Sequence, residues 1–282
     1  MTQTLLLCIG AQKAGTTWLA DFMRTQPQVH LPPVKEVHFF DARYAPKWCA
    51  KYEEEMLAEF QHDVAALTLA NCGDPALQHK LHAMLLRFRM IANPGEYLRF
   101  MSWGAQQRSV LFEATPDYSM LDRAGFQAMR DMHPNTKLIF LLRNPADRFW
   151  SSMKFNRTHN PAFDIDVMFD RLIEREDFML LADYGRTLRE ALAVFSPERV
   201  HVEFYERLFD QAAVDRICRF AGIAPGKADF GGRSNASFAG DMPDDRRRQA
   251  IKAYAHIYRD MAARFGEALP ESWRRDQASL PG

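Results

Sequence analysis

A glycine-bracketed loop directly after a short apolar run is the feature that most constrains this chain. The run covers residues 5–9 and stops at Gly10, which favours a parallel strand buried on both faces over a helix. Gly10 and Gly15 enclose four residues, so the backbone between them can turn tightly and direct several N–H groups at one anion. Thr16 and Thr17 add hydroxyls where a helix dipole favours negative charge. The segment therefore predicts an anion-binding strand, loop and helix.

The loop departs from the Walker A pattern at one position. That pattern, G-x-x-x-x-G-K-[ST], places a lysine directly after the second glycine, where it reaches the β- and γ-phosphates of a nucleotide. Here that position is Thr16, and the lysine of the loop is Lys13. The displacement disfavours an ordinary kinase or ATPase. A P-loop nucleotide kinase stays open as an alternative, with Asp117 as its magnesium carboxylate.

A second strand-to-helix junction lies at residues 138–152. The apolar run ends in Arg143, Pro145 stands where a first helical turn tolerates a missing N–H, and Ser151 follows about two turns into the helix. A guanidinium offers a planar fork of donors suited to phosphate, and a hydroxyl can complete such a pocket. Taken singly, Arg143 could form a surface ion pair and Ser151 could be a helix-face hydroxyl. Arg148 of the same helix has a less certain role.

Strand and helix patterns alternate along the chain. The expected fold class is therefore α/β, a three-layer sandwich with a mostly parallel central sheet, P-loop NTPase-like, whose ligands bind at the carboxyl ends of the strands. Further strands are predicted at 109–112 and 199–204, and helices at 122–132, 145–157 and 183–195.

We expect one domain over residues 1–282, because no repeat or linker divides the chain. Residues 46–107 show helical periodicity at 52–69 and 77–90 without a strand pattern, and we interpret them as a helical insertion that caps the site or shapes the acceptor cleft. A long helix is expected over 244–265, with Gly266 as its C-cap.

Composition restricts location and partners. The 36 basic and 36 acidic residues balance, so no global field attracts nucleic acid or an anionic membrane. No apolar run reaches the ~18 residues of a membrane span, and no leader pattern precedes the first strand. The four cysteines lack C-x-x-C spacing, which disfavours a disulfide framework or a zinc site. We predict a cytoplasmic protein without a metal.

Two motifs resemble those of the sulfotransferases that use 3′-phosphoadenosine 5′-phosphosulfate (PAPS). G-A-Q-K-A-G-T-T-W-L at 10–19 resembles their 5′-phosphosulfate loop, and R-N-P-x-x-R-x-x-S at 143–151 resembles their 3′-phosphate motif. The resemblance implies PAPS as sulfuryl donor, its desulfated form PAP as product, and in-line transfer to an acceptor hydroxyl. It implies donor contacts from Gly10, Gln12, Lys13, Ala14, Gly15, Thr16, Thr17, Trp18, Arg143 and Ser151.

The segment K-E-V-H-F-F-D at 35–41 resembles K-E-x-H-F-F-D of heparan-sulfate-type carbohydrate sulfotransferases, in which the glutamate is the general base. The resemblance implies Glu36 as base, a saccharide acceptor and, since the chain starts at its first strand, a bacterial member. Lys13 would assist the leaving group as charge develops there. His38 is the competing base, because its ordinary pKa suits proton transfer and an extended segment would place it on the same face as Glu36. It could equally be a packed, hydrogen-bonded histidine. Lys35 is expected to pair with a nearby phosphate or carboxylate.

Weaker patterns leave alternatives open. Trp18 could stack on the adenine or lie in the core. E-A-T-P-D-Y at 113–118 resembles a family segment E-K-[ST]-P-x-Y, and Glu113 and Tyr118 become acceptor-side candidates. Ala114 replaces the lysine of that segment, which leaves the acceptor class open. Arg233 lies where related enzymes place a late basic loop and is a candidate phosphate contact. A PAPS-binding protein without catalytic activity is a further alternative.

Overall fold

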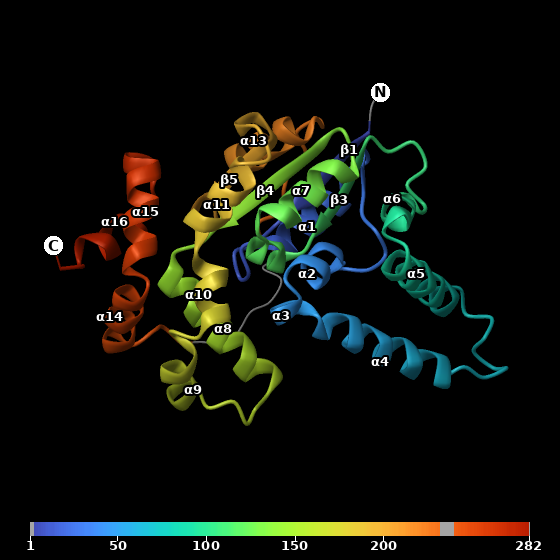
Figure 1. Cartoon of the computed structure of the whole chain (residues 1–282), viewed down its shortest axis with the longest axis horizontal. Coiled ribbons are helices and arrows are strands. Elements are labelled where there is room, and N and C mark those ends of the chain that lie inside the picture. The colour runs from blue at the N-terminus through green and yellow to red at the C-terminus, as the bar shows by residue number, and fades with distance from the viewer. Residues whose placement is uncertain (1–2, 232–239, 282) are drawn as a thin grey trace.

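A five-stranded parallel sheet forms the centre of the protein (Figure 1). The computed structural model describes residues 3–231 and 240–281. The strand order is β2-β3-β1-β4-β5, which confirms the predicted α/β class with a parallel sheet. The strands are β1 (Thr4–Cys8), β2 (Val29–His30), β3 (Val110–Ala114), β4 (Thr136–Leu142) and β5 (Val200–Phe204).

The sheet has helices on both faces. From β1 the chain passes through α1 (Thr16–Arg24) to β2 at one edge, and from β3 it passes through α7 (Arg123–Met132) in the opposite direction to β4. Right-handed crossovers in opposite directions place α1 and α7 on opposite faces. The expected three layers follow from this topology.

The strand order creates a switch point at the centre of the sheet. The connection that leaves β1 runs toward β2, whereas the connection that leaves β4 runs toward β5. The two strands are direct neighbours, with Cys8 paired to Ile139. In open parallel sheets, ligands bind at the carboxyl ends of strands at such a point. Both anion motifs of the sequence follow these two strands.

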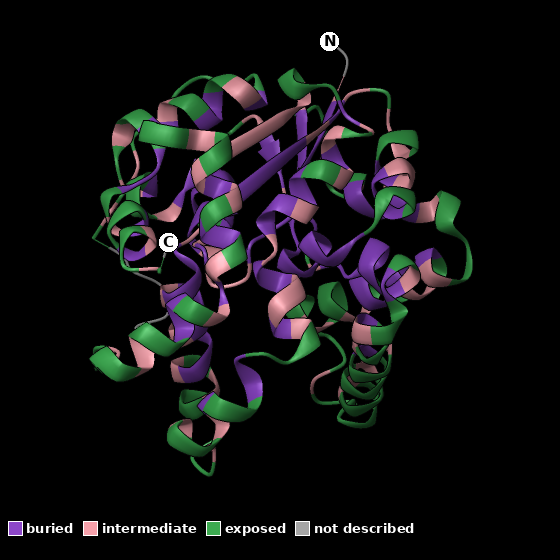
Figure 2. Ribbon diagram, turned by 60° about the vertical axis from the view of Figure 1, so that its left-hand side comes forward, coloured by how far each residue is buried: buried purple, intermediate pink, exposed green. Residues whose placement is uncertain are grey.

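The core accounts for the apolar runs. All residues of β1 and β3 are buried, as are all but one residue of β4. Figure 2 shows these strands enclosed by helices whose outer faces are exposed. Burial on both faces explains why the strands have continuous apolar sequences instead of alternating ones.

Residues 46–107 are helical, as their periodicity predicts. They contain α4 and α5, which extend from one side of the sheet (Figure 1), and the predicted 52–69 helix ends earlier than expected, at residue 65. The elements of this part are α3 (Pro46–Cys49), α4 (Lys51–Ala65), α5 (Pro75–Ala92), the 3₁₀ helix η1 (Pro94–Glu96) and α6 (Tyr97–Ser102), and α2 (Phe39–Tyr44) directly precedes them.

The predicted single helix over 244–265 is wrong, because it is interrupted at Tyr254. The backbone there has φ −95° and ψ 18°, and the buried ring packs against Phe149 with centroids 6.1 Å apart. The segment has neither glycine nor proline, so no sequence signal marked the break. Gly266 caps the second part, as expected.

The remaining elements are η2 (Pro116–Met120), α8 (Pro145–His159), α9 (Ile165–Leu172), α10 (Glu176–Ala182), α11 (Tyr184–Leu192), η3 (Pro197–Arg199), α12 (Tyr205–Leu208), α13 (Gln211–Ala221), α14 (Asp244–Ala253), α15 (Ala255–Phe265), η4 (Gly266–Ala268) and α16 (Glu271–Ala278). Within the described ranges, no helix has both the length and the apolar character needed to cross a membrane.

Candidate active site

The loop between β1 and α1 has the shape that its glycines predict. Gly15 is the N-cap of α1 with φ 90°, and a Cβ there would lie 2.7 Å from Leu208 Cδ2. Gly10 has φ 130°, and its Cβ would lie 2.7 Å from the carbonyl oxygen of Pro116. The loop can therefore pass close to neighbouring elements only with glycine at both positions. The first N–H groups of α1, starting at Thr16, have no partner within the helix and can bind an anion.

Arg143, at the end of β4, contacts this loop directly. Its Nη1 donates a hydrogen bond to the carbonyl oxygen of Lys13 at 2.8 Å, and its guanidinium carbon lies 4.2 Å from the ring centroid of Tyr205. The hydroxyl of Tyr184 donates to the carbonyl oxygen of Arg143 at 2.8 Å. These contacts, instead of a surface ion pair, fix the arginine between the two anion motifs.

The helix after Arg143 begins as its sequence predicts. Asn144 caps α8 by accepting from the N–H groups of residues 146 and 147, and Pro145 follows in the first turn. Ser151 is buried on this helix. Arg148 is fully buried and donates from Nη2 to the carbonyl oxygen of Phe178 at 3.1 Å. Its position favours a structural contact over a donor contact.

Lys13 has an unusual environment within the loop. Its backbone has φ 65°, and its ammonium nitrogen lies 3.7 Å from the ring centroid of Phe155 on α8. Burial, followed by the positive charge of Arg143, lowers the pKa of Lys13 to about 8, while the charge of Glu36 acts in the opposite direction. A side chain with this pKa changes charge close to neutral pH.

Glu36 and His38 are close together, but not in the way expected. The prediction of an extended segment is wrong, since both residues have left-handed backbone conformations, with φ 56° and 52°. His38 is the N-cap of α2, where the chain turns sharply. The turn brings His38 Nε2 to 3.8 Å from Glu36 Oε2. Residues other than glycine that have a left-handed backbone conformation are concentrated at functional sites.

A buried aspartate holds the other side of the imidazole. His38 Nδ1 lies 2.6 Å from Asp41 Oδ2, and Asp41 is fully buried in the first turn of α2. Burial alone would lower the pKa of His38, but the hydrogen bond and the charge of Asp41 outweigh it and raise that pKa. The histidine is thus packed and hydrogen-bonded, and it also faces Glu36.

Lys35 connects residues 35–41, which include Glu36, to the anion loop, residues 10–17 between β1 and the first turn of α1. Its ammonium donates to Thr17 Oγ1 at 2.9 Å and lies 3.4 Å from Glu36 Oε1. The expected carboxylate partner is therefore Glu36. The structure in this way brings Glu36 beside the residues at the start of α1.

Two further residues, Tyr52 and Asp117, lie beside His38, and no sequence motif indicates Tyr52. The ring of Tyr52, on α4, stacks on the imidazole with centroids 3.7 Å apart and an angle of 18° between the planes. Its hydroxyl donates to Asp117 Oδ2 at 2.6 Å. Asp117, the magnesium carboxylate of the kinase alternative, makes this contact with one of its two oxygens. Only the spatial approach of α4 to η2 could reveal the pair.

Glu113 and Tyr118 are not acceptor-side residues. Their side chains are buried, and Glu113 accepts hydrogen bonds from the hydroxyls of Tyr97, Thr115 and Tyr118. Burial raises the pKa of Glu113 to about 7. The Tyr118 hydroxyl also accepts from the N–H of Phe39 at 3.2 Å, which ties α2 to the sheet. Residues 113–118 therefore hold the start of α2 in place through buried hydrogen bonds.

Trp18 lies in the core in this structure. It is 7% exposed, its ring stacks near Phe22 and Phe230 at 6.0 and 5.8 Å, and its Nε1 donates to the carbonyl oxygen of Asp229 at 3.3 Å. Of the other loop residues, Ala14 is buried and Gln12 is half-buried. Arg233 lies outside the described residues.

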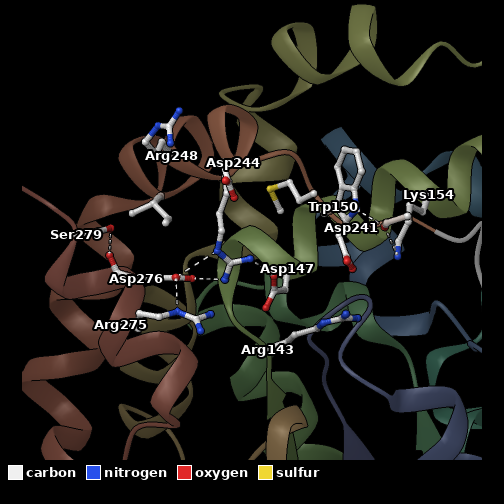
Figure 3. Close-up of a pocket in the computed structure, with 14 residues that line it drawn as sticks. Arg143, Asp147, Trp150, Lys154, Asp241, Asp244, Arg248, Arg275, Asp276 and Ser279 are labelled. Atoms are coloured by element: carbon white, nitrogen blue, oxygen red, sulfur yellow. Dashed lines mark hydrogen bonds and ion pairs between the residues drawn. The ribbon is translucent and has the colours of Figure 1, made fainter.

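A cavity of about 600 Å³ opens on the side of Arg143 that faces the C-terminal helices (Figure 3). Residues of α8, α14 and α16 line it. Arg247 crosses it and pairs with Asp147 at 2.8 Å and Asp276 at 2.6 Å. Basic and acidic side chains alternate along its wall, so the cavity has no strong preference for an anion.

Known proteins share this architecture. The chain is similar to the crystal structure of a sulfotransferase from Alicyclobacillus acidocaldarius, with a TM-score of 0.68 and 22% identity over 98% of this chain and 100% of that chain. A sulfotransferase domain from the curacin biosynthetic pathway has a TM-score of 0.48 and 14% identity over 100% and 99% of the two chains. None of the curated proteins compared matches the sequence. The first likeness supports the fold.

A family model identifies the chain more directly. The model of the sulfotransferase domain matches residues 3–230, which include the loop after β1, the Glu36 segment and the Arg143 motif. This range covers well over half of the 282 residues. The chain therefore belongs to the sulfotransferase family, enzymes that transfer a sulfuryl group.

Proposed function

We propose that this sulfotransferase uses PAPS as donor and transfers the sulfuryl group to an acceptor hydroxyl, with a saccharide as acceptor. One observation carries the proposal: Arg143 and Glu36 both lie near Lys13, in the loop after β1. Arg143 bonds to the Lys13 carbonyl, and the charges of Glu36 and Arg143 both act on the Lys13 ammonium. This side of the sheet thus combines two candidate anion-binding elements with the cation of Lys13 and the carboxylate of Glu36.

The residues suit a nucleotide that carries anionic groups at both ends. The start of α1 offers backbone N–H groups and the hydroxyls of Thr16 and Thr17 to a 5′-phosphosulfate. Arg143 and Ser151 suit a 3′-phosphate, since the arginine keeps a buried Nε without a partner among the described residues. Bound there, PAPS would supply the activated sulfuryl group.

Lys13 and Glu36 suit the two tasks of the transfer. The sulfur–oxygen bond to the phosphate breaks, and the ammonium of Lys13 stabilises the negative charge that this oxygen gains. The acceptor oxygen forms the new bond to sulfur and loses its proton to Glu36. His38 stays the competing base, and its contact with Asp41 suits a role in support of Glu36.

The saccharide acceptor rests on the K-E-V-H-F-F-D segment, and Ala114 weakens it by replacing a cation of the related enzymes. A nucleotide kinase is less well supported, because Thr16 stands where the Walker loop has its lysine. A binding protein without catalysis would need the same donor contacts, but it would need neither leaving-group assistance from Lys13 nor a base at Glu36.

The test is transfer of ³⁵S from labelled PAPS to a panel of glycans, phenols and small alcohols. We expect labelled glycans with the wild type, and at least ~100-fold less product with Lys13→Ala and Glu36→Gln. Glu54→Gln, which alters an exposed residue of α4, is the matched control and should retain activity. Label found only in phenols or alcohols would contradict the saccharide acceptor.

The same preparations separate the alternatives. Magnesium-dependent transfer of the γ-phosphate from ATP would instead support a kinase. PAP binding that Arg143→Ala abolishes, combined with transfer that Lys13→Ala and Glu36→Gln leave unchanged, would refute the catalytic roles assigned to Lys13 and Glu36.

A further inference from the structure

Described residues lie against both nitrogens of the His38 imidazole and against one face of its ring. Asp41 binds Nδ1 at 2.6 Å, Glu36 faces Nε2 at 3.8 Å, and the ring of Tyr52 covers one face at 3.7 Å. A ring nitrogen of His38 and one carboxylate oxygen each of Asp41 and Asp117 lie within 4.8 Å of one another. The side chain is 9% exposed.

Tyr52 and Asp117 form one unit beside His38. The hydroxyl of Tyr52 donates to Asp117 Oδ2 at 2.6 Å, so the tyrosine ring cannot turn away from His38 without breaking a short bond to a buried carboxylate. Asp117 is itself attached to the sheet edge, because the N–H of Thr115, two residues before it, donates to the carbonyl oxygen of Cys8 at 3.1 Å. Through Asp117 and Thr115, Tyr52 is therefore held in a fixed position relative to the end of β1, and the stacked ring of His38 is held with it.

Each contact restricts a different motion of the imidazole. The bond to Asp41 selects which nitrogen points inward, and the stacked ring of Tyr52 limits rotation about the Cβ–Cγ bond. Together they leave Nε2 directed at Glu36. A ring held only by Asp41 could swing its Nε2 away, because a single hydrogen bond fixes one atom and not a plane.

We propose that Tyr52 and Asp117 are positioning residues that hold His38 Nε2 toward Glu36, so that His38 receives the proton that Glu36 takes from the acceptor. This inference rests on the proposed function. The proton passes from the acceptor oxygen to Glu36 and from Glu36 to Nε2 of those His38 rings that are unprotonated, and Glu36 regains its negative charge. The 3.8 Å contact must shorten for this step, as catalytic contacts in free enzymes commonly do.

The charges around the imidazole suit a proton acceptor. Among the described residues, Glu36, Asp41 and Asp117 act on the charge of His38, and Cys49 and Tyr52 contact Asp41 and Asp117. Arg87, Glu113 and Tyr118 interact electrostatically with Asp41. Burial raises the pKa values of Cys49, Tyr52 and Asp117, which keeps the thiol and the phenol protonated at neutral pH. The carboxylates of Asp41, Asp117 and Glu36 all favour the imidazolium. An imidazolium formed during turnover would therefore be stabilised where it arises.

The first measurement is an NMR titration of the His38 imidazole in the complete free protein, assigned with His38→Asn. We expect Asp117→Asn to lower the pKa of His38 by roughly half a unit or more. Tyr52→Phe keeps the stacking, but it removes the bond that favours the Asp117 carboxylate, and it should lower this pKa to a smaller extent. Glu54→Gln removes an exposed charge from the same helix as Tyr52 and should leave it unchanged.

The second measurement is turnover of the same variants. Tyr52→Phe should lower kcat by about tenfold without changing the KM for PAPS, and Tyr52→Leu should lower it further. A His38 pKa and a kcat that both stay at wild-type values in Tyr52→Phe and Asp117→Asn would overturn the inference. If Asp117→Asn does not fold, Tyr52→Phe decides alone. The titration needs no turnover, so a shifted His38 pKa in a protein that transfers no sulfuryl group would support the positioning contacts and refute only the proposed function.

Discussion

Arg143 Nη1 donates a hydrogen bond to the backbone carbonyl oxygen of Lys13 at 2.8 Å. The bond joins the residue at the end of β4 to the loop after β1, and it forms because these strands are neighbours at the switch point of the sheet. A group that binds Arg143 can therefore influence the loop that holds Lys13. The two motifs, more than 100 residues apart in the sequence, are therefore in direct contact.

The conservative change Arg143→Lys should damage both parts of this site. An ammonium cannot reproduce the planar fork that contacts the Lys13 carbonyl and that, in the proposed function, also binds a phosphate. We expect PAP to bind at least ~10-fold more weakly by calorimetry, which corresponds to about 1.4 kcal/mol. Arg130→Lys, an exposed change on α7, is the control. Equal PAP affinity in Arg143→Lys and wild type would contradict the assignment.

The pH dependence of catalysis should report the ionisation of Lys13. Its pKa is lowered to about 8 in the free protein, so the catalytically useful ammonium is present below this pH and is lost above it. We expect kcat/KM for PAPS to fall above pH ~8, because this parameter follows groups of the free enzyme. Lys13→Arg keeps its charge throughout and should lack this fall. An alkaline limb of the same position in Lys13→Arg would contradict the assignment.

The elements that determine the anion loop are local, and the sequence predicts them well. An apolar run, Gly10 and Gly15 at a fixed spacing, and hydroxyls at a helix start all act within a few residues of one another. The same holds for the junction at Arg143 and Pro145. Their meeting in space also follows, since a parallel α/β sheet brings the carboxyl ends of its strands to one edge.

Contacts between distant segments could not be predicted in this way. The two-residue strand β2 is too short for a pattern, and Tyr254 breaks a helix without a glycine or proline. The approach of Tyr52 to His38 depends on how α4 packs, and the turn at Glu36 and His38 requires backbone conformations that their side chains disfavour. The role of Trp18 could not be predicted either, because a tryptophan at this position can pack in the core or stack on a nucleotide base.

The conformation of the loop at Gly15 gives a stability prediction. Gly15→Ala introduces a Cβ at φ 90° that would lie 2.7 Å from Leu208 Cδ2, and we expect a loss of roughly 2–4 kcal/mol of unfolding free energy in urea. Gly222→Ala is a matched control, with φ 77° and nothing within 4 Å, and should lose about 1 kcal/mol. Equal losses would show that the contact with Leu208 contributes nothing.

Glu113 should make the stability of the protein depend on pH. Its folded-state pKa of about 7 exceeds the ordinary 4.5, so its favourable contribution is complete below pH 4.5 and is lost as pH rises through 7. Glu113→Gln keeps an acceptor for the surrounding hydroxyls but does not titrate. Relative to wild type, we expect the variant to gain on the order of 3 kcal/mol between pH 4.5 and 7.

Unfolding free energies measured across this range test the prediction, with Glu54→Gln as the exposed control. A constant difference between Glu113→Gln and wild type would mean that the buried carboxyl does not titrate as described.

We predict that the carboxyl ends of β1 and β4 bind a nucleotide through phosphates at both its 5′ and 3′ positions. Calorimetric binding of PAP and of 5′-AMP to the wild-type protein tests it most directly, because the two ligands differ only in the 3′-phosphate that Arg143 and Ser151 would hold. We predict that PAP binds at least ~100-fold more tightly than 5′-AMP, a difference of about 2.7 kcal/mol, and that Arg143→Ala removes most of this preference. Equal affinities for the two nucleotides, or tighter binding of ATP with magnesium, would contradict the claim.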